Sequence, residues 1–234
     1  MKRFWQVAAM AAAQDGYRVL LDGRPVRLPG GAALVVPARG LAEAITAEWN
    51  AAGTARGGAM DWNDVPLTRL AGTAQERIAP NPQPVARRIA QYGETDLLCY
   101  RAEGPEALVQ RQHELWSVWL DWVEGAYGAK LKVTTGVMPV AQDPEALAAL
   151  GRAVADKTPA ALAALGVAVP ALGSLVLGLA LAAFRLDAAR AWTTASVDED
   201  FQAGLWGRDE EGERRRCRVA EEVAMAERFL RLAG

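Results

Sequence analysis

Cysteine and histidine are scarce in this chain of 234 residues, which contains two cysteines and one histidine. Cys99 and Cys217 lie far apart, and neither belongs to a CxxC motif, so the sequence predicts no structural zinc site. We expect both thiols to be reduced and buried, because free cysteine is among the most buried residue types. A single disulfide between the two is the alternative.

The motifs of nucleotide, metal and hydrolytic chemistry are also missing. The chain has no GxxxxGK[ST], GxGxxG, HExxH or GxSxG sequence and no EF-hand loop, so we expect no catalytic residue, no cofactor and no metal. His113 lies in a predicted helix with no orienting partner specified by the sequence. An enzyme with a dispersed site, in which His113 and a carboxylate from another helix act together, is retained as an alternative.

Positive and negative charges nearly cancel, because the chain has 26 basic and 28 acidic residues. This balance gives no overall attraction to nucleic acid or to an anionic membrane. Residues 159–184 carry no charge at all, yet Pro170 divides them into a helix ending near Leu165 and a helix over 170–184. The second would span roughly 22 Å, short of the roughly 30 Å of a bilayer core. We therefore expect a buried helix, with a membrane-peripheral assembly factor as an alternative.

The first third of the chain predicts strands and turns. Residues 5–12, 17–21, 24–28 and 34–36 are extended in pattern, and Asp22-Gly23 is a strong hairpin signal. Helical spacing follows over 38–52 and 66–78. Three prolines within residues 80–84 mark a boundary. We expect an α+β fold, with a small β-rich domain containing one or two helices over 1–80 and a larger, mainly helical domain over 81–234.

Beyond the boundary the pattern is mostly helical. Helices are predicted over 85–92, 105–127, 143–157, 187–195, 198–206 and 210–232, with an extended segment over 130–140. The basic N-terminus precedes only a short apolar stretch, so we expect a cytoplasmic protein with no signal peptide.

Charged and aromatic residues near the C-terminus are candidates for binding. Asp198, Glu199 and Asp200 begin a predicted helix, where acids stabilise the helix dipole. Arg214, Arg215 and Arg216 are expected on a solvated face, paired with glutamates at helical spacing. The chain has eight tryptophans, and tryptophan is enriched at protein interfaces as well as in cores.

An ordered set of short motifs runs through almost the whole chain. The set comprises YRVLLDGRP at 17–25, LAEAI at 41–45 with Glu48 and Trp49, PLTRLA at 66–71, ETDLLCYRA at 94–102, Trp116 and Trp119, SLVL at 174–177, DEDFQ at 198–202, and Trp206-Gly207. Together they resemble the family of assembly chaperones for the alpha subunit of F-type ATP synthase, which has mitochondrial and alphaproteobacterial members. Two departures are the lack of a recognisable presequence and Val65 at a position where methionine is usual.

The resemblance implies a two-domain, non-enzymatic chaperone without a cofactor. Its implied partner is the unassembled alpha subunit, held until the beta subunit displaces it, and we expect a monomer. The implied location is the bacterial cytoplasm, or the mitochondrial matrix for eukaryotic relatives. The family's functional acid precedes its Phe/Tyr-Gln and Trp-Gly elements, so Glu199 is the candidate here, with Asp198 and Asp200 as alternatives one position away. Phe201 and Trp206 complete the predicted partner-binding set.

Overall fold

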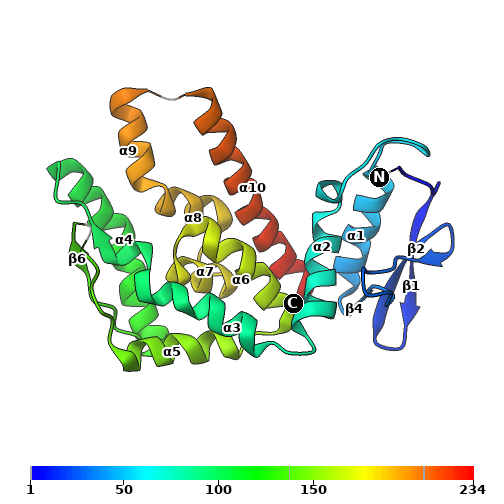
Figure 1. Ribbon diagram of the computed structural model, residues 1–234, viewed down its shortest axis with the longest axis horizontal. Helices are drawn as coiled ribbons and strands as arrows, with labels where there is room; N and C mark the ends of the chain where they lie inside the picture. Colours follow the sequence, from blue (N-terminus) through cyan, green and yellow to red (C-terminus); the bar gives the residue numbers. More distant parts are fainter. Residues whose placement is uncertain (1, 137, 208) are drawn as a thin grey trace. The chain divides into compact units, whose positions relative to one another are not determined.

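The computed structural model describes residues 2–136, 138–207 and 209–234 (Figure 1). The chain forms two compact units. The first contains the chain up to Pro82 together with residues 158–164 and 228–234, and the second contains residues 83–157 and 165–227. Strands with a few helices in the first unit and mostly helices in the second confirm the predicted α+β class. That residues 1–80 and 81–234 are separate domains, each able to fold independently, remains a prediction.

A small antiparallel sheet forms one layer of the first unit. Strands β1 (Ala8–Ala13) and β2 (Gly16–Leu21) pair along their whole length, and β2 also pairs with β3 (Arg24–Pro25) and β4 (Val35–Val36). Asp22 and Gly23, both at positive φ, form the predicted hairpin turn. The first strand begins three residues later than expected, and before it the backbone N–H groups of Gln6 and Val7 donate to the Asp22 carboxylate.

Helical segments follow this sheet in the chain, and the first of them packs against β1 and β2. They are α1 (Arg39–Ala51), a 3₁₀ turn over Trp62–Asp64, α2 (Pro66–Gly72) and a π-helical turn over Thr73–Ile78. The Trp5 indole N–H donates to the Trp49 carbonyl oxygen at 3.0 Å, and the Trp49 indole N–H donates to the Thr68 hydroxyl at 2.9 Å. These bonds satisfy both buried indoles and tie α1 to α2 and to the start of the chain.

The second unit consists mainly of helices. Its elements are α3 (Gln83–Ala90), 3₁₀ turns over Gln91–Thr95 and Leu97–Cys99, β5 (Tyr100–Arg101), α4 (Glu106–Tyr127), β6 (Thr134–Thr135), α5 (Pro144–Ala155), α7 (Leu175–Ala182), α8 (Ala188–Ala195) and α9 (Val197–Trp206). Helices α6 (Pro159–Leu172) and α10 (Glu210–Ala233) contribute residues to both units. In the segment expected to be extended, β6 pairs with β5 in parallel, and Val137 lies outside the described residues.

Asp96, the third residue of the ETDLLCYRA motif, organises the start of α7. Its fully buried carboxylate accepts bonds from the Leu98 and Val176 backbone N–H groups and from the Ser174 hydroxyl, at 2.8–3.1 Å. Ser174 in turn caps the helix by accepting from the Leu177 N–H. Burial raises the pKa of Asp96 to about 6, while its hydrogen-bond donors act in the opposite direction. The motif therefore joins two segments that are distant in sequence.

The predicted helix boundary at Pro170 is wrong. Pro170 lies inside α6, close to its C-terminus, and the chain breaks instead at Gly173, whose φ of +63° ends that helix. The proline is accommodated because only its own N–H is lost from the final turn, whereas a left-handed glycine stops the helix. Helix α7 then begins at Leu175, and nearly all of its side chains are buried.

The apolar segment 159–184 thus contributes to the core. No helix in the described ranges is long and apolar enough to cross a bilayer. Both cysteines are free. Cys99 is buried as expected, but the prediction is wrong for Cys217, which is exposed because it lies on the outer side of α10.

Candidate functional site: a groove between α9 and α10

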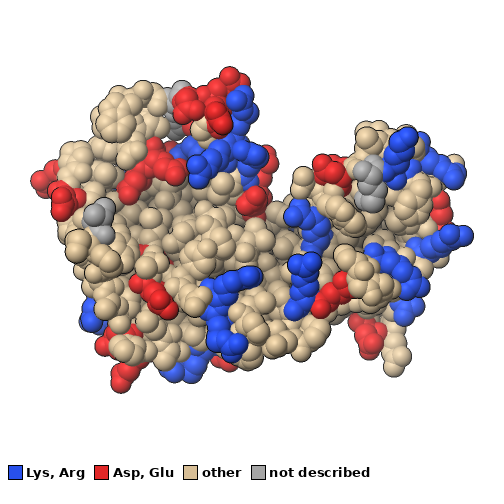
Figure 2. Space-filling view, in the orientation of Figure 1, with Lys and Arg blue, Asp and Glu red and all other residues tan. Residues whose placement is uncertain are grey.

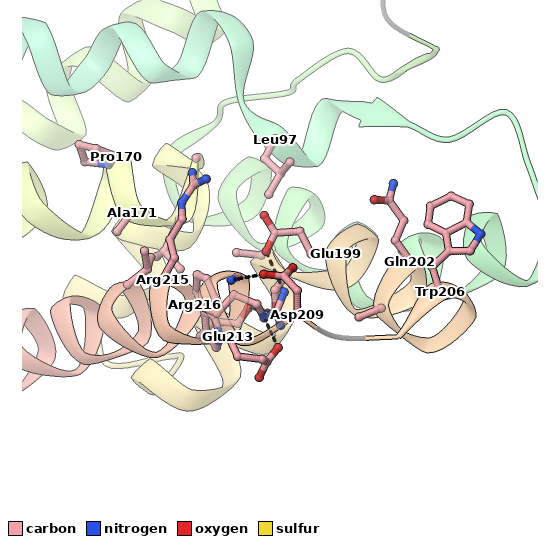
Figure 3. Close-up of a pocket in the computed structure, with 18 of the residues that line it drawn as sticks. Leu97, Pro170, Ala171, Glu199, Gln202, Trp206, Asp209, Glu213, Arg215 and Arg216 are labelled. Atoms are coloured by element: carbon pink, nitrogen blue, oxygen red, sulfur yellow. Dashed lines mark hydrogen bonds and ion pairs between the residues drawn. The ribbon is translucent and has the colours of Figure 1, made fainter.

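An open groove with a volume of about 550 Å³ lies between α9 and α10 in the second unit. Helix α9 lines it with Glu199, Gln202, Ala203 and Trp206. These positions are three, four and seven residues from Glu199, which is the spacing of one helical face. Glu199, Gln202 and Trp206 project from the same side of α9 (Figure 3). A face of α10 forms the opposite wall, and it includes Gly212, Glu213, Arg215, Arg216 and Val219.

The predicted binding residues divide into two groups. Glu199 and Trp206 line the groove, and both are exposed, with 64% of the Glu199 side chain and 80% of Trp206 accessible. Asp198, Asp200 and Phe201 are only partly exposed, and they lie off the groove-lining face. The structure therefore brings two of the five predicted residues to one surface.

Arg216 holds α9 against α10. Its Nη1 atom lies 2.8 Å from Glu199 Oε2 (Figure 3). Its Nη2 atom lies 2.6 Å from Asp200 Oδ1. The guanidinium also stands over the Trp192 ring, 5.6 Å from its centroid, which is a cation–π distance. With only 17% of its side chain exposed, Arg216 forms part of the groove's floor.

The prediction for the arginine run is therefore correct for Arg214, whereas for Arg216 it is wrong about exposure to solvent. Arg214 pairs with Glu210 on the same helix, four residues away and well exposed. Arg216 lies 3.6 Å from Glu213 at the predicted helical spacing, but it is mostly buried and makes its shorter pairs with α9. Packing of the two helices brings the acidic first turn of α9 within reach of its side chain. Acidic and basic side chains gather side by side over the first turns of α10 (Figure 2).

Asp198 is positioned by a contact with α4, the helix that packs against α9 on the side away from α10. Its Oδ1 accepts a bond of 2.6 Å from the side-chain amide of Gln112 on α4. That buried glutamine also accepts from the Ala102 backbone N–H at 2.8 Å. Ser196 occupies the cap position of α9, although its side chain makes no cap bond to the helix start. The three acids lie in the first turn of the helix. They still favour the helix through its dipole.

His113 lies on an exposed face of α4. In the described ranges its only hydrogen-bond partner is the Ser117 hydroxyl, 3.2 Å from Nδ1. An open depression of about 710 Å³ beside it is also lined by Arg101, Glu103 and Asp121. No cluster of three or more His, Cys, Asp or Glu side chains suited to a metal occurs within residues 2–136, 138–207 and 209–234.

Sequence reasoning missed several residues of the groove, chiefly Trp192, Gln202, Arg215 and Arg216. Gln202 could have been found, because it lies one turn from Glu199 on the predicted helix. Trp192 and Arg216 could not, because their place in the groove depends on how α8, α9 and α10 pack together.

Comparison with known proteins agrees with this architecture. The family model described as ATP12 chaperone protein matches residues 2–124. The crystal structure of Atp12 from Paracoccus denitrificans is similar with a TM-score of 0.92 at 43% identity, covering 100% of this chain and 98% of that one. An aspartate-to-lysine mutant of the Paracoccus denitrificans protein matches with the same TM-score at 42% identity and the same coverage.

A third solved structure, from Agrobacterium tumefaciens, is 38% identical with a TM-score of 0.90. The match covers 100% of this chain and 86% of that one. The family match spans more than half of the chain, and the relatives align over its full length. The chain therefore belongs to the ATP12 chaperone family.

Proposed function

We propose that this chaperone binds the unassembled alpha subunit of F-type ATP synthase and prevents its aggregation until the beta subunit takes its place. The proposal extends the family assignment to one client. It places part of the client contact in the groove between α9 and α10, and the observation that carries this placement is the exposed pair Glu199 and Trp206 on one helical face.

The physical need for such a chaperone follows from subunit assembly. A subunit made without its neighbour exposes apolar surface that it would later bury, and such surface promotes aggregation. An exposed tryptophan offers a large, rigid contact for that surface, and an adjacent carboxylate adds polar steering. A contact of this kind can hold the client and still release it.

Client release requires no nucleotide in this proposal. When the beta subunit occupies the same surface of the alpha subunit with higher affinity, mass action displaces the chaperone. The role requires no catalytic residue, and we propose that the protein acts as a monomer in the cytoplasm of a bacterium.

Of the two proposed contact residues, Glu199 and Trp206, Glu199 allows the more specific test. Its carboxylate lies at the groove with one oxygen paired to Arg216, and most of its side chain remains accessible. Asp198 and Asp200 have partners on α4 and α10 and are more shielded. One of the similar solved structures is an aspartate-to-lysine mutant of the Paracoccus denitrificans protein, which supports testing charge reversal in this chain.

The test is a pull-down of purified alpha subunit by the full-length chaperone, followed by addition of beta subunit. We expect capture of the alpha subunit and its loss when beta subunit is added. Glu199→Lys should weaken capture by at least tenfold, and Glu199→Gln should weaken it less because it keeps the size of the side chain.

Glu211→Lys is the matched control. Glu211 is an exposed acid on α10 that does not line the groove, so its charge reversal should leave capture within about twofold of wild type. Equal capture by the Glu199→Lys and Glu211→Lys variants would disprove the role of the groove. Absence of capture by the wild-type chaperone would disprove the choice of client.

A further inference from the structure

Strand β1 has one edge that no other strand covers. In the described sheet β1 pairs only with β2, with Ala8 opposite Leu21 and Ala13 opposite Gly16. Along an antiparallel strand, alternate residues direct their backbone groups toward the neighbour and away from it. The outward-directed groups of β1 therefore determine what this edge can bind.

The bonds at the start of the strand identify which residues face outward. The Ala8 N–H donates to Asn50 Oδ1 at 2.8 Å, and Asn50 Nδ2 donates to the Ala8 carbonyl at 2.9 Å. Because Ala8 uses both groups away from β2, Met10 and Ala12 face outward as well. Neither residue has a backbone or side-chain partner for these outward groups among the described residues.

This edge lacks the features by which proteins usually protect exposed strands. Its six residues are five alanines and a methionine, with no proline and no charged residue. Strand β3, by contrast, contains Arg24 and Pro25. An unprotected edge is a template for pairing with another extended chain, and Asn50 already makes this type of contact at Ala8.

The charge beside the edge favours one kind of occupant. Arg18 lies directly opposite Ala11 on the solvent-facing side of the sheet, since its neighbour Val19 faces the core. Arg18 is exposed and has no ion-pair partner in the described ranges. The small Ala11 side chain leaves the guanidinium free to reach over β1, toward an acidic side chain on an added strand.

We propose that the outer edge of β1 accepts an extended segment of the client subunit as an additional antiparallel or parallel strand, with an acidic residue opposite Ala11. The client identity rests on the proposed function. A second copy of this chain is a poorer occupant, because its β1 strand consists of alanines and a methionine and offers no acidic side chain opposite Ala11.

Hydrogen exchange of the wild-type chaperone, alone and with purified alpha subunit, tests the edge directly. We expect the Met10 and Ala12 amides to slow by at least tenfold in the complex. Complex formation with unchanged exchange at both amides would overturn the edge proposal and leave the proposed function standing. Concentration-dependent protection of these amides in the chaperone alone would assign the edge to a second copy, and would also overturn it.

A pair of variants separates backbone pairing from side-chain effects. Ala12→Pro removes one outward N–H without touching the β1–β2 ladder, and proline is tolerated at such edge positions. It should weaken capture of the alpha subunit by about tenfold, whereas Ala12→Ser, which keeps the N–H, should bind as wild type. Wild-type affinity of a folded Ala12→Pro variant would contradict the proposal.

Arg18→Glu tests the acidic requirement, and we expect weaker capture that is partly restored at high salt. Unchanged capture by this variant would disprove that the client places an acidic residue opposite Ala11. If the wild-type chaperone captures no alpha subunit, the proposed function and this inference both fail. Loss of capture in Glu199→Lys with retained protection of Met10 and Ala12 would separate the two contacts.

Discussion

Arg216 Nη2 and Asp200 Oδ1 are 2.6 Å apart across the α9–α10 boundary, with 17% and 22% of the two side chains exposed. The pair is shielded enough to resist screening by salt, and a second carboxylate, Glu199, shares the same guanidinium. The position of the groove's acidic wall therefore depends on an arginine that sequence reasoning assigned to a solvated face.

Replacing Arg216 should destabilise the protein more than replacing its neighbour Arg214. Arg216→Ala removes the cation that Glu199, Asp200 and Glu213 share and the contact with Trp192, so we expect a loss of about 1–3 kcal/mol. Arg214→Ala removes a well-exposed ion pair with Glu210 and should cost less than about 0.5 kcal/mol. Urea unfolding of both variants measures the difference, and equal losses would contradict the role given to Arg216.

Trp206→Ala should separate binding from stability. The side chain is largely exposed, so we expect the free energy of unfolding to change by less than about 0.5 kcal/mol. Capture of the alpha subunit should weaken by about tenfold or more if Trp206 is a binding hot spot. Trp62→Ala, at another exposed tryptophan, is the control and should bind normally. Similar losses of alpha-subunit capture in both variants would show that the effect of an exposed tryptophan does not depend on its position in the groove.

Stability should depend on pH through Asp96. Its pKa is raised from 3.8 to about 6 on folding, so the folded state binds the proton more tightly than the unfolded state between these values. The stabilisation from protonation is complete below about pH 3.8 and is lost as pH rises through about 6. The loss amounts to about 3 kcal/mol for a difference of about two in pKa.

Comparison with Asp96→Asn isolates this contribution. The variant loses an acceptor for one of three donors, so it should be less stable overall. Its free energy of unfolding should nevertheless fall less between pH 4 and pH 7 than that of wild type. Urea titrations at several pH values measure both slopes, and parallel slopes would show that Asp96 does not titrate in this range.

Two helical glycines should respond oppositely to alanine. A Cβ added at Gly178 in α7 would clash with the Val169 Cγ2 atom, so Gly178→Ala should destabilise the protein by about 1–3 kcal/mol. A Cβ at Gly151 in α5 would meet no atom within 4 Å. Gly151→Ala should therefore stabilise the helix by about 0.5–1 kcal/mol. Thermal melting of the two variants checks the signs, and two shifts in the same direction would contradict the packing described for α6 and α7.

Local patterns predicted most of the helices and strands of this fold. Asp143 and Pro144 begin α5, Gly207 follows α9, and Asp22-Gly23 turns the hairpin, because each of these signals acts within a few residues. The division between α6 and α7 was placed wrongly, since both Pro170 and Gly173 are local signals and the sequence does not rank them. Packing of Gly178 against Val169 and the capping by Asp96 and Ser174 decide that division.

The candidate site was less accessible to sequence reasoning. Glu199 and Trp206 were identified through resemblance and both line the groove. Arg216 has glutamates three and five residues away on its own helix, so local spacing could not reveal its pairing with α9. The open edge of β1 was equally hidden, because it depends on which strands pair and on the bonds that Asn50 makes.

The two cysteines lie in different environments, so one of them can be labelled selectively in the unmodified chain. Burial raises the pKa of the Cys99 thiol to about 12, so little reactive thiolate forms there near neutral pH. Cys217 is exposed on α10 and follows Arg216 directly. A maleimide dye should therefore attach at a single site on α10, next in sequence to the groove residue Arg216. Its fluorescence could follow client capture and release in real time without engineered residues.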